Sequence, residues 1–124
     1  MDREPEVADA KKPDIRLRSK ADGIKAAIEI KIADSKRSSA KGLEEALKKQ
    51  LVGQYLRHDS CRAGCLLLTF NGKRKSWPTS TGIRLNPTQL VLHLNQLAQK
   101  LEAQRRGEVR VVVFGLHLAP DQPV

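Results

Sequence analysis

Near its start the chain has two runs in which apolar and polar residues alternate, 14–18 and 24–33, separated by a turn-forming stretch at 20–23. A period of two is typical of a β-strand with one buried face. In the second run four isoleucines share one face, while Glu29 and Lys31 share the other. The pattern predicts two paired strands, with the isoleucines on the buried face.

The pattern changes to a helical period between Gly42 and about His58. At 100° per residue, Leu43, Leu47 and Leu51 fall on one face, and Val52 falls mostly away from it. Ala46, Gln50 and Gln54 lie among the leucines. We therefore predict a helix whose apolar stripe contains two glutamines.

Two strands and a helix are expected in the second half of the chain. The continuous apolar run 64–70 predicts a central strand covered on both faces. A basic, turn-rich connection at 73–85 follows, and Asn86 with Pro87 and Gln89 has the pattern of a helix start. The apolar stripe of this helix consists of Leu90, Leu94, Leu97 and Leu101. Gly107 suits the helix end, and 109–118 reads as the last strand. The order strand, strand, helix, strand, helix, strand predicts an α/β domain with a mixed sheet flanked by helices.

The length of 124 residues suits one domain, which we expect to extend over 13–119. Residues 1–12 read as a flexible lead-in or as the point where a longer protein was cut, and 120–124 read as a tail. No run is apolar enough to span a membrane, and no signal peptide is visible, so we expect a cytoplasmic protein. The net charge of +9 favours a nucleic acid as partner, but only four aromatic residues are present, which argues against a base-stacking module.

Three charged residues of the first two strands form a candidate site. If the strands pair, Asp14 comes close to Glu29 and Lys31 at the sheet surface. Two carboxylates with room for solvent suit Mg²⁺ or Mn²⁺, and a neighbouring lysine can hold a water. Such a site predicts metal-assisted hydrolysis of phosphodiesters.

At these positions the sequence resembles the PD-(D/E)XK nuclease superfamily: Pro13-Asp14, a gap of 14 residues, and then Glu29-Ile30-Lys31. The resemblance implies a restriction-endonuclease-like fold. It also implies that Asp14, Glu29 and the carbonyl of Ile30 bind the metal and that Lys31 orients or deprotonates the attacking water.

The predicted helix adds to this resemblance. Its segment with Gln50, Gln54 and Tyr55 looks like the glutamine and tyrosine signature that follows the catalytic strand in many members of the superfamily. Gln50 and Tyr55 are five residues apart, where about four is usual, whereas Gln50 and Gln54 are four apart. Which pair acts therefore stays open. An amide on an apolar helix face costs about 1 to 3 kcal/mol unless it meets a polar group, which favours a site role.

The usual N-terminal helix and strand of the superfamily have no counterpart, because residues 1–12 show no apolar pattern. Either the domain is minimal or truncated, or a second subunit or an absent N-terminal region completes the sheet.

Two basic clusters are candidates for contact with nucleic-acid phosphates. Lys36 and Arg37 follow the catalytic strand, and residues 73–75 with Trp77 follow the central strand; the members of the second cluster are Lys73, Arg74, Lys75 and Trp77. Solvated loops, and a tryptophan that packs on the domain, are the alternatives.

The sequence thus predicts a divalent-metal-dependent nuclease, with DNA favoured over RNA only by analogy with the superfamily. The alternative is a catalytically inactive relative that binds nucleic acid or a protein partner. The presence of all three of Asp14, Glu29 and Lys31 favours the enzyme.

Overall fold

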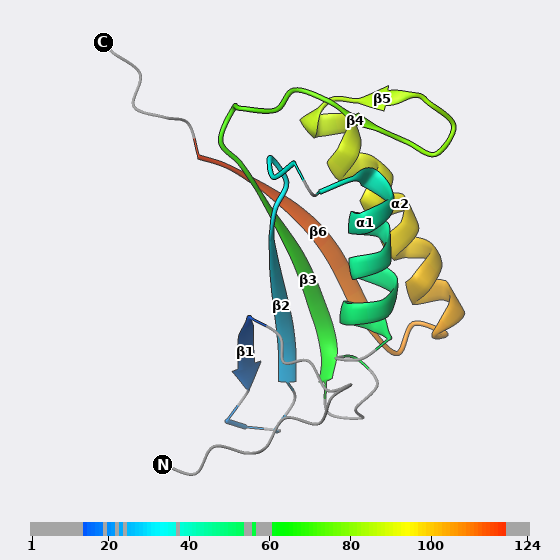
Figure 1. Ribbon diagram of the computed structural model, residues 1–124. Helices are drawn as coiled ribbons and strands as arrows, with labels where there is room; N and C mark the ends of the chain where they lie inside the picture. The colour runs from blue at the N-terminus through cyan, green and yellow to red at the C-terminus, as the bar shows by residue number, and fades with distance from the viewer. Residues whose placement is uncertain are drawn as a thin grey trace, which may run out of the picture.

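The computed structural model describes residues 14–18, 20–21, 23, 25–36, 38–53, 56 and 61–118. Its elements are, in order, β1 (Ile15–Arg18), β2 (Lys25–Ile32), α1 (Ala40–Glu45), η1 (Ala46–Val52), β3 (Cys61–Phe70), β4 (Trp77–Pro78), β5 (Arg84–Leu85), α2 (Pro87–Gln104) and β6 (Arg110–His117) (Figure 1). The predicted α/β class and the order of the main elements are confirmed. The short strands β4 and β5 pair within the connection expected at 73–85. The predicted lead-in and tail lie outside the described residues.

Four strands form a mixed sheet in the order β1-β2-β3-β6. β1 is antiparallel to β2, with Ile15 opposite Ile28. β2, β3 and β6 are parallel, and in their register Cys65 lies between Ile28 and Val112. The parallel pairs require long crossovers, and the helical segments lie in these connections.

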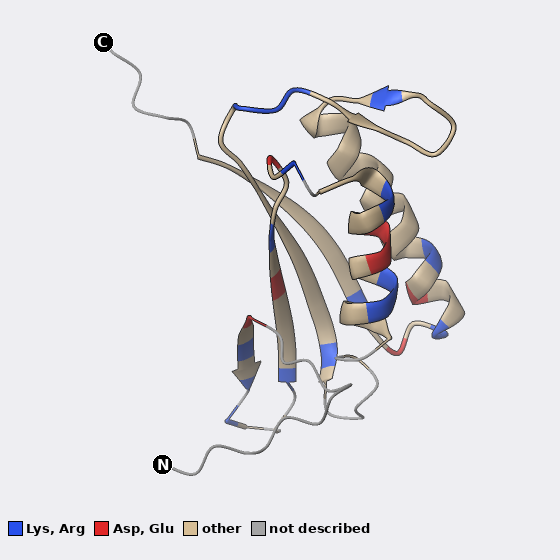
Figure 2. Cartoon of the chain, in the orientation of Figure 1, with Lys and Arg blue, Asp and Glu red and all other residues tan. Residues whose placement is uncertain are grey.

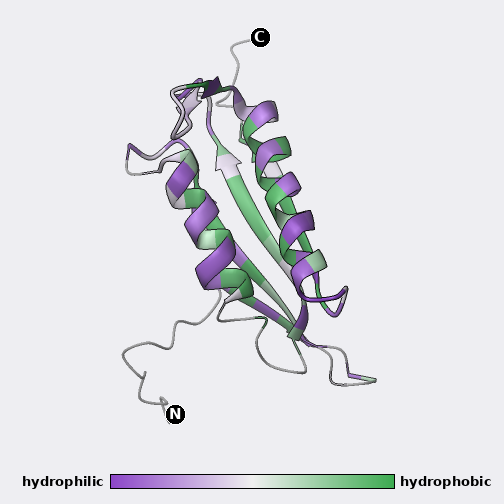
Figure 3. Ribbon diagram, turned by 90° about the vertical axis from the view of Figure 1, so that its right-hand side faces the viewer, coloured by the Kyte–Doolittle hydropathy of each residue, from purple (hydrophilic) through white to green (hydrophobic). Residues whose placement is uncertain are grey.

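Both helical segments cover the same face of the sheet. α1 continues into η1, and together with α2 this segment lies in front of the sheet in Figure 3, so that the opposite side of the sheet in Figure 1 has no described helix. Crossovers between parallel strands share one hand, and here both step in the same direction, from β2 to β3 and from β3 to β6. The two helical layers must therefore lie on one side.

This arrangement corrects the prediction that the isoleucines of β2 form the buried face. Ala27 is buried beneath the helices, whereas Ile32 on the other side is 60% exposed. We call the helix side the covered face; its residues include Ala27, Glu29, Lys31, Gly64, Leu66, Leu68, Val111 and Val113. We call the other side the open face; its residues include Ile15, Leu17, Ile28, Ile30, Ile32, Cys65, Leu67, Val112, Phe114 and Leu116.

The central strand β3 is also covered on one face only by the described residues. Its burial alternates, with Leu66 and Leu68 fully buried and Leu67 half-buried, so the predicted double coverage is wrong. The strand begins at Cys61, three residues before the predicted start. Around Arg62 its register to β2 shifts by one residue, and this bulge lets Cys61 lie on the covered face.

The first helical segment starts at Ala40, two residues before the predicted start, because Ser39 caps it by accepting a hydrogen bond from the N–H of Gly42 at 2.9 Å. From Ala46 onward it is a π-helix, in which hydrogen bonds join residues five apart. This spacing brings Val52 into the core together with Leu47, although a regular 100° period predicts that Val52 faces away.

α2 begins as predicted. The side chain of Asn86 accepts the N–H of Gln89, the side chain of Gln89 accepts the N–H of Asn86, and Pro87 is the first helical residue. Its buried stripe consists of Leu90, Leu94, Ala98 and Leu101. Leu97, predicted for this stripe, is only partly buried.

Side chains of α2 also occupy the outer edge of β6. The amide of Asn95 accepts from the N–H of Val113 and donates to its carbonyl, both at 2.8 Å. A carboxylate oxygen of Glu102 accepts the N–H of Val111 at 2.8 Å. These contacts use backbone groups that an added strand would need for pairing.

Candidate functional site

The pairing of β1 with β2 brings the predicted acidic residues together. Ile15 is opposite Ile28, so the register extended by one pair places Asp14 opposite Glu29. A carboxylate oxygen of Asp14 accepts the backbone N–H of Ile30 at 2.7 Å. Asp14 therefore lies beside β2 between Glu29 and Lys31, just beyond the start of β1.

Glu29 and Lys31 project from the covered face of β2 toward the helical layer. Glu29 is 7% exposed and is the one buried charged residue among those described. The ammonium nitrogen of Lys31 lies 3.4 Å from a carboxylate oxygen of Glu29, and the lysine side chain stays about one-third exposed. The ion pair thus holds a carboxylate inside the domain while its cation reaches solvent.

The donor atoms suit a hard divalent cation with few protein ligands. Among the described residues there is no group of three or more His, Cys, Asp or Glu side chains placed to hold a metal ion. Asp14 and Glu29 supply a pair of carboxylates, and Mg²⁺ commonly binds one or two carboxylates while it keeps several waters. This pair fits Mg²⁺ better than a metal that needs a full cage of side chains.

The π-helical segment η1 places Gln50 in the layer that packs on β2 and β3. The amide oxygen of Gln50 is buried without a hydrogen-bond partner among the described residues. π-Helical turns occur often at functional sites, and a buried amide oxygen without a partner is costly. Gln54 and Tyr55, the other predicted residues of this signature, lie outside the described residues.

The end of η1 depends on a glycine. The N–H of Gly53 donates to the carbonyl of Lys48 at 2.8 Å, and a Cβ at position 53 would lie 2.7 Å from the carbonyl oxygen of Lys49. A side chain at Gly53 would therefore force the last turn of η1 to shift. Because Gln50 belongs to this turn, the glycine helps to set its position.

The predicted basic clusters lie at the end of the sheet where β2 and β3 finish. A carboxylate oxygen of Asp34 accepts backbone N–H groups at 2.8 to 3.3 Å and ties the two loops together; the donors are Asn71, Lys73 and Arg74. Lys36, Lys73 and Lys75 are exposed. Arg37 lies outside the described residues.

Arg74 and Trp77 make contacts within the domain, with Trp77 buried and Arg74 half-buried. The guanidinium of Arg74 donates to the carbonyls of Ser35, Ser38 and Ser76 and lies 5.1 Å from the centre of the Trp77 ring. Trp77 is 0% exposed, and its indole N–H donates to the carbonyl of Ala33 at 2.8 Å. Trp77 therefore packs on the domain, as the alternative interpretation expected. Its buried ring is not available to a nucleic acid in this fold.

Two arginines that motif reasoning missed follow Asp14 along β1. Arg16 and Arg18 alternate with Ile15 and Leu17 along β1, so they share the side of the sheet on which Asp14 and Glu29 lie. The period of two that begins at Asp14 already contained this signal. Figure 2 shows basic segments gathered where β1 ends and β2 and β3 begin, and Lys25 and Arg62 belong to these segments. These cations would attract the phosphate groups of a nucleic acid that lies near Asp14.

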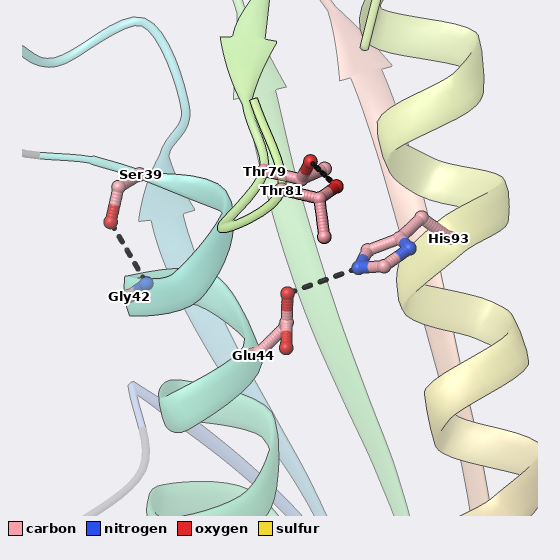
Figure 4. Close-up of polar contacts among 6 residues, drawn as sticks. All are labelled: Ser39, Gly42, Glu44, Thr79, Thr81 and His93. Carbon is pink, nitrogen blue, oxygen red and sulfur yellow. Dashed lines mark hydrogen bonds and ion pairs between the residues drawn. The ribbon is translucent and has the colours of Figure 1, made fainter. Parts of the chain in front are cut away.

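A separate polar contact joins α1 to α2 and does not involve Asp14 or Glu29. The Nε2 atom of His93 lies 3.0 Å from a carboxylate oxygen of Glu44, and the hydroxyls of Thr79 and Thr81 form their own hydrogen bond nearby (Figure 4). This contact links α1 to α2 and involves none of the predicted site residues.

The chain matches no family model, no curated protein and no solved structure. Within the described residues, no helix has both the length and the apolar character needed to cross a membrane.

Proposed function

We propose that this protein is a divalent-metal-dependent nuclease that hydrolyses phosphodiester bonds, with DNA favoured over RNA by the resemblance to PD-(D/E)XK nucleases and with the site at Asp14, Glu29 and Lys31. The observation that carries the proposal is the hydrogen bond from the Ile30 N–H to Asp14, because it fixes one carboxylate beside a buried second one and an ammonium group. A structural ion pair would need only two of these three charges.

Each residue has a distinct role in this proposal. Asp14 and Glu29, with the carbonyl of Ile30, would hold Mg²⁺ or Mn²⁺, and the ion would polarise a phosphoryl oxygen and lower the pKa of a bound water. Lys31 would orient that water. Arg16 and Arg18 would attract the phosphate backbone toward the site, and Lys36, Lys73 and Lys75 would contact it farther along the sheet.

The test is cleavage of plasmid, single-stranded DNA and RNA with Mg²⁺ or Mn²⁺ and with a chelator. Cleavage should require the metal and should fall by about a hundredfold or more in Asp14→Asn, Glu29→Gln and Lys31→Ala. Lys41→Ala and Glu108→Gln change exposed residues of the same charge elsewhere and should keep full activity.

Two further measurements separate the roles. Calorimetry with Mn²⁺ should show binding that is lost in Asp14→Asn and Glu29→Gln, and Lys31→Ala should bind DNA nearly as well as the unchanged protein. Absence of metal-dependent cleavage on all three substrates, or full cleavage by Glu29→Gln, contradicts the proposal. DNA binding without cleavage would support the alternative of an inactive nucleic-acid-binding relative.

A further inference from the structure

The open face of the sheet exposes an apolar surface across all four strands. The most exposed side chains include Ile32 at 60%, Phe114 at 55% and Leu17 at 53%. Ile15, Val112 and Leu116 add to this surface, and Leu118 follows directly after β6. These seven side chains, each roughly half exposed, together expose several hundred Å² of apolar area. That is at the upper limit for a typical monomer and approaches the ~800 Å² per partner of a standard interface.

Covering a sheet face takes an apolar stripe from a helix or from another sheet. The open face of a second copy of this chain is such a surface, because it carries the same exposed apolar side chains.

The two edges of the sheet are less suitable for a partner than the open face. On β6, Asn95 and Glu102 already occupy the backbone groups of Val113 and Val111. On the opposite edge, β1 has only four residues. A partner therefore gains little by adding a strand and gains most by packing against the open face.

Charge restricts where two copies of this chain can meet. The chain carries a net charge of +9, so two copies repel each other over most of their surface. Among the described strand residues that the register places on the open face, Arg110 at the start of β6 is the one charged side chain; Arg62 lies at the bulge of β3, where the register pairs it with no residue of β2. Away from Arg110, two copies can approach here without apposed charges, and two apolar sheet faces pack at about 10 Å.

We propose that the open face forms a symmetric homodimer in which the two sheets pack face to face. In such an interface the same residues come from both copies, so Phe114 and Ile32 contribute twice. The proposal is independent of the proposed nuclease function, because Glu29 and Lys31 project from the other face of the sheet.

Sedimentation velocity and light scattering on the unchanged protein, between about 1 and 100 μM, test the proposal. We expect a dimer. Phe114→Lys should raise the dimer Kd by about a hundredfold or more, because the interface would bury two ammonium groups without partners. Ile83→Lys makes the same substitution at a 63% exposed position outside the sheet and should leave the dimer unchanged.

The circular dichroism spectrum should stay unchanged in Phe114→Lys, which distinguishes lost association from lost folding. Ile32→Lys supplies a second variant at the other side of the same face, with the same expected result. A monomer at every concentration, a species larger than a dimer, or a dimer that tolerates both Phe114→Lys and Ile32→Lys overturns the proposal.

Discussion

The two faces of the sheet differ most in β2, where the usual relation between burial and polarity is reversed. In β2 the face beneath the helices carries Glu29 and Lys31, whereas the face without a described cover carries isoleucines. A strand that only stabilised the fold would bury its isoleucines. The covered face of β2 therefore combines packing with a pair of charged side chains, and the open face leaves apolar side chains accessible to another surface.

The sharpest test of this comparison uses neighbouring leucines of β3 that point in opposite directions. Leu66 is 0% exposed beneath the helices, and Leu67 is half-buried on the open face. In dilute protein, Leu66→Ala should lower the free energy of unfolding by about 3 to 5 kcal/mol, and Leu67→Ala by about 1 kcal/mol or less. Urea unfolding measures both. Equal losses would show that the open face is as well packed as the covered one.

A smaller effect is expected when the charge is removed from the covered face. Glu29→Leu should raise the free energy of unfolding by about 1 to 2 kcal/mol, since a leucine suits the helix-sheet interface and Lys31 can turn to solvent. Mn²⁺ binding should be lost in the same variant. The matched change Glu108→Leu, at an exposed position, should alter neither property. A loss of stability in Glu29→Leu would instead assign the carboxylate a structural role.

The smallest effect concerns the two thiols of β3, one on each face. Burial raises the pKa of both Cys61 and Cys65, and for Cys61 the nearby cations of Arg16 and Lys25 oppose that shift in part. Because the thiolate is the reactive form, alkylation of both should still accelerate at a pH where an exposed thiol has levelled off.

In dilute protein, Cys65 should react roughly fivefold faster than Cys61, since it lies on the open face. Mass spectrometry of timed maleimide labelling, with a cysteine peptide as reference, measures the rates. A faster reaction at Cys61 would mean that the helices do not shield the covered face from the reagent.

The periodicity of the sequence was enough to predict the main strands and helices and the position of Asp14 beside β2. Strand alternation fixes which residues share a face, and the Asn86 cap is a local signal that needs no tertiary contact. Neither property tells which face the helices cover, because that depends on the strand order and on the direction of the crossovers. The prediction for the isoleucines was wrong for this reason.

Other differences arise from contacts between distant segments. Trp77 was predicted as a nucleic-acid contact from the lysines around it, but its burial depends on the Ala33 carbonyl and on Phe70, whose ring it meets edge to face at 5.4 Å. Val52 enters the core because the helix becomes π-helical, which a regular 100° period does not represent. The nuclease function, the metal and the nucleic-acid partner stay predictions.

The contacts of Asn95 and Glu102 with β6 have a consequence for misfolding. A free eight-residue edge next to an apolar sheet face would be a template for cross-β aggregation. While α2 is docked, its side chains occupy that edge at Val111 and Val113. Detachment of α2 would expose the edge and the buried leucines of the covered face at once. The docking of one helix therefore protects this chain against fibril formation as well as completing its core.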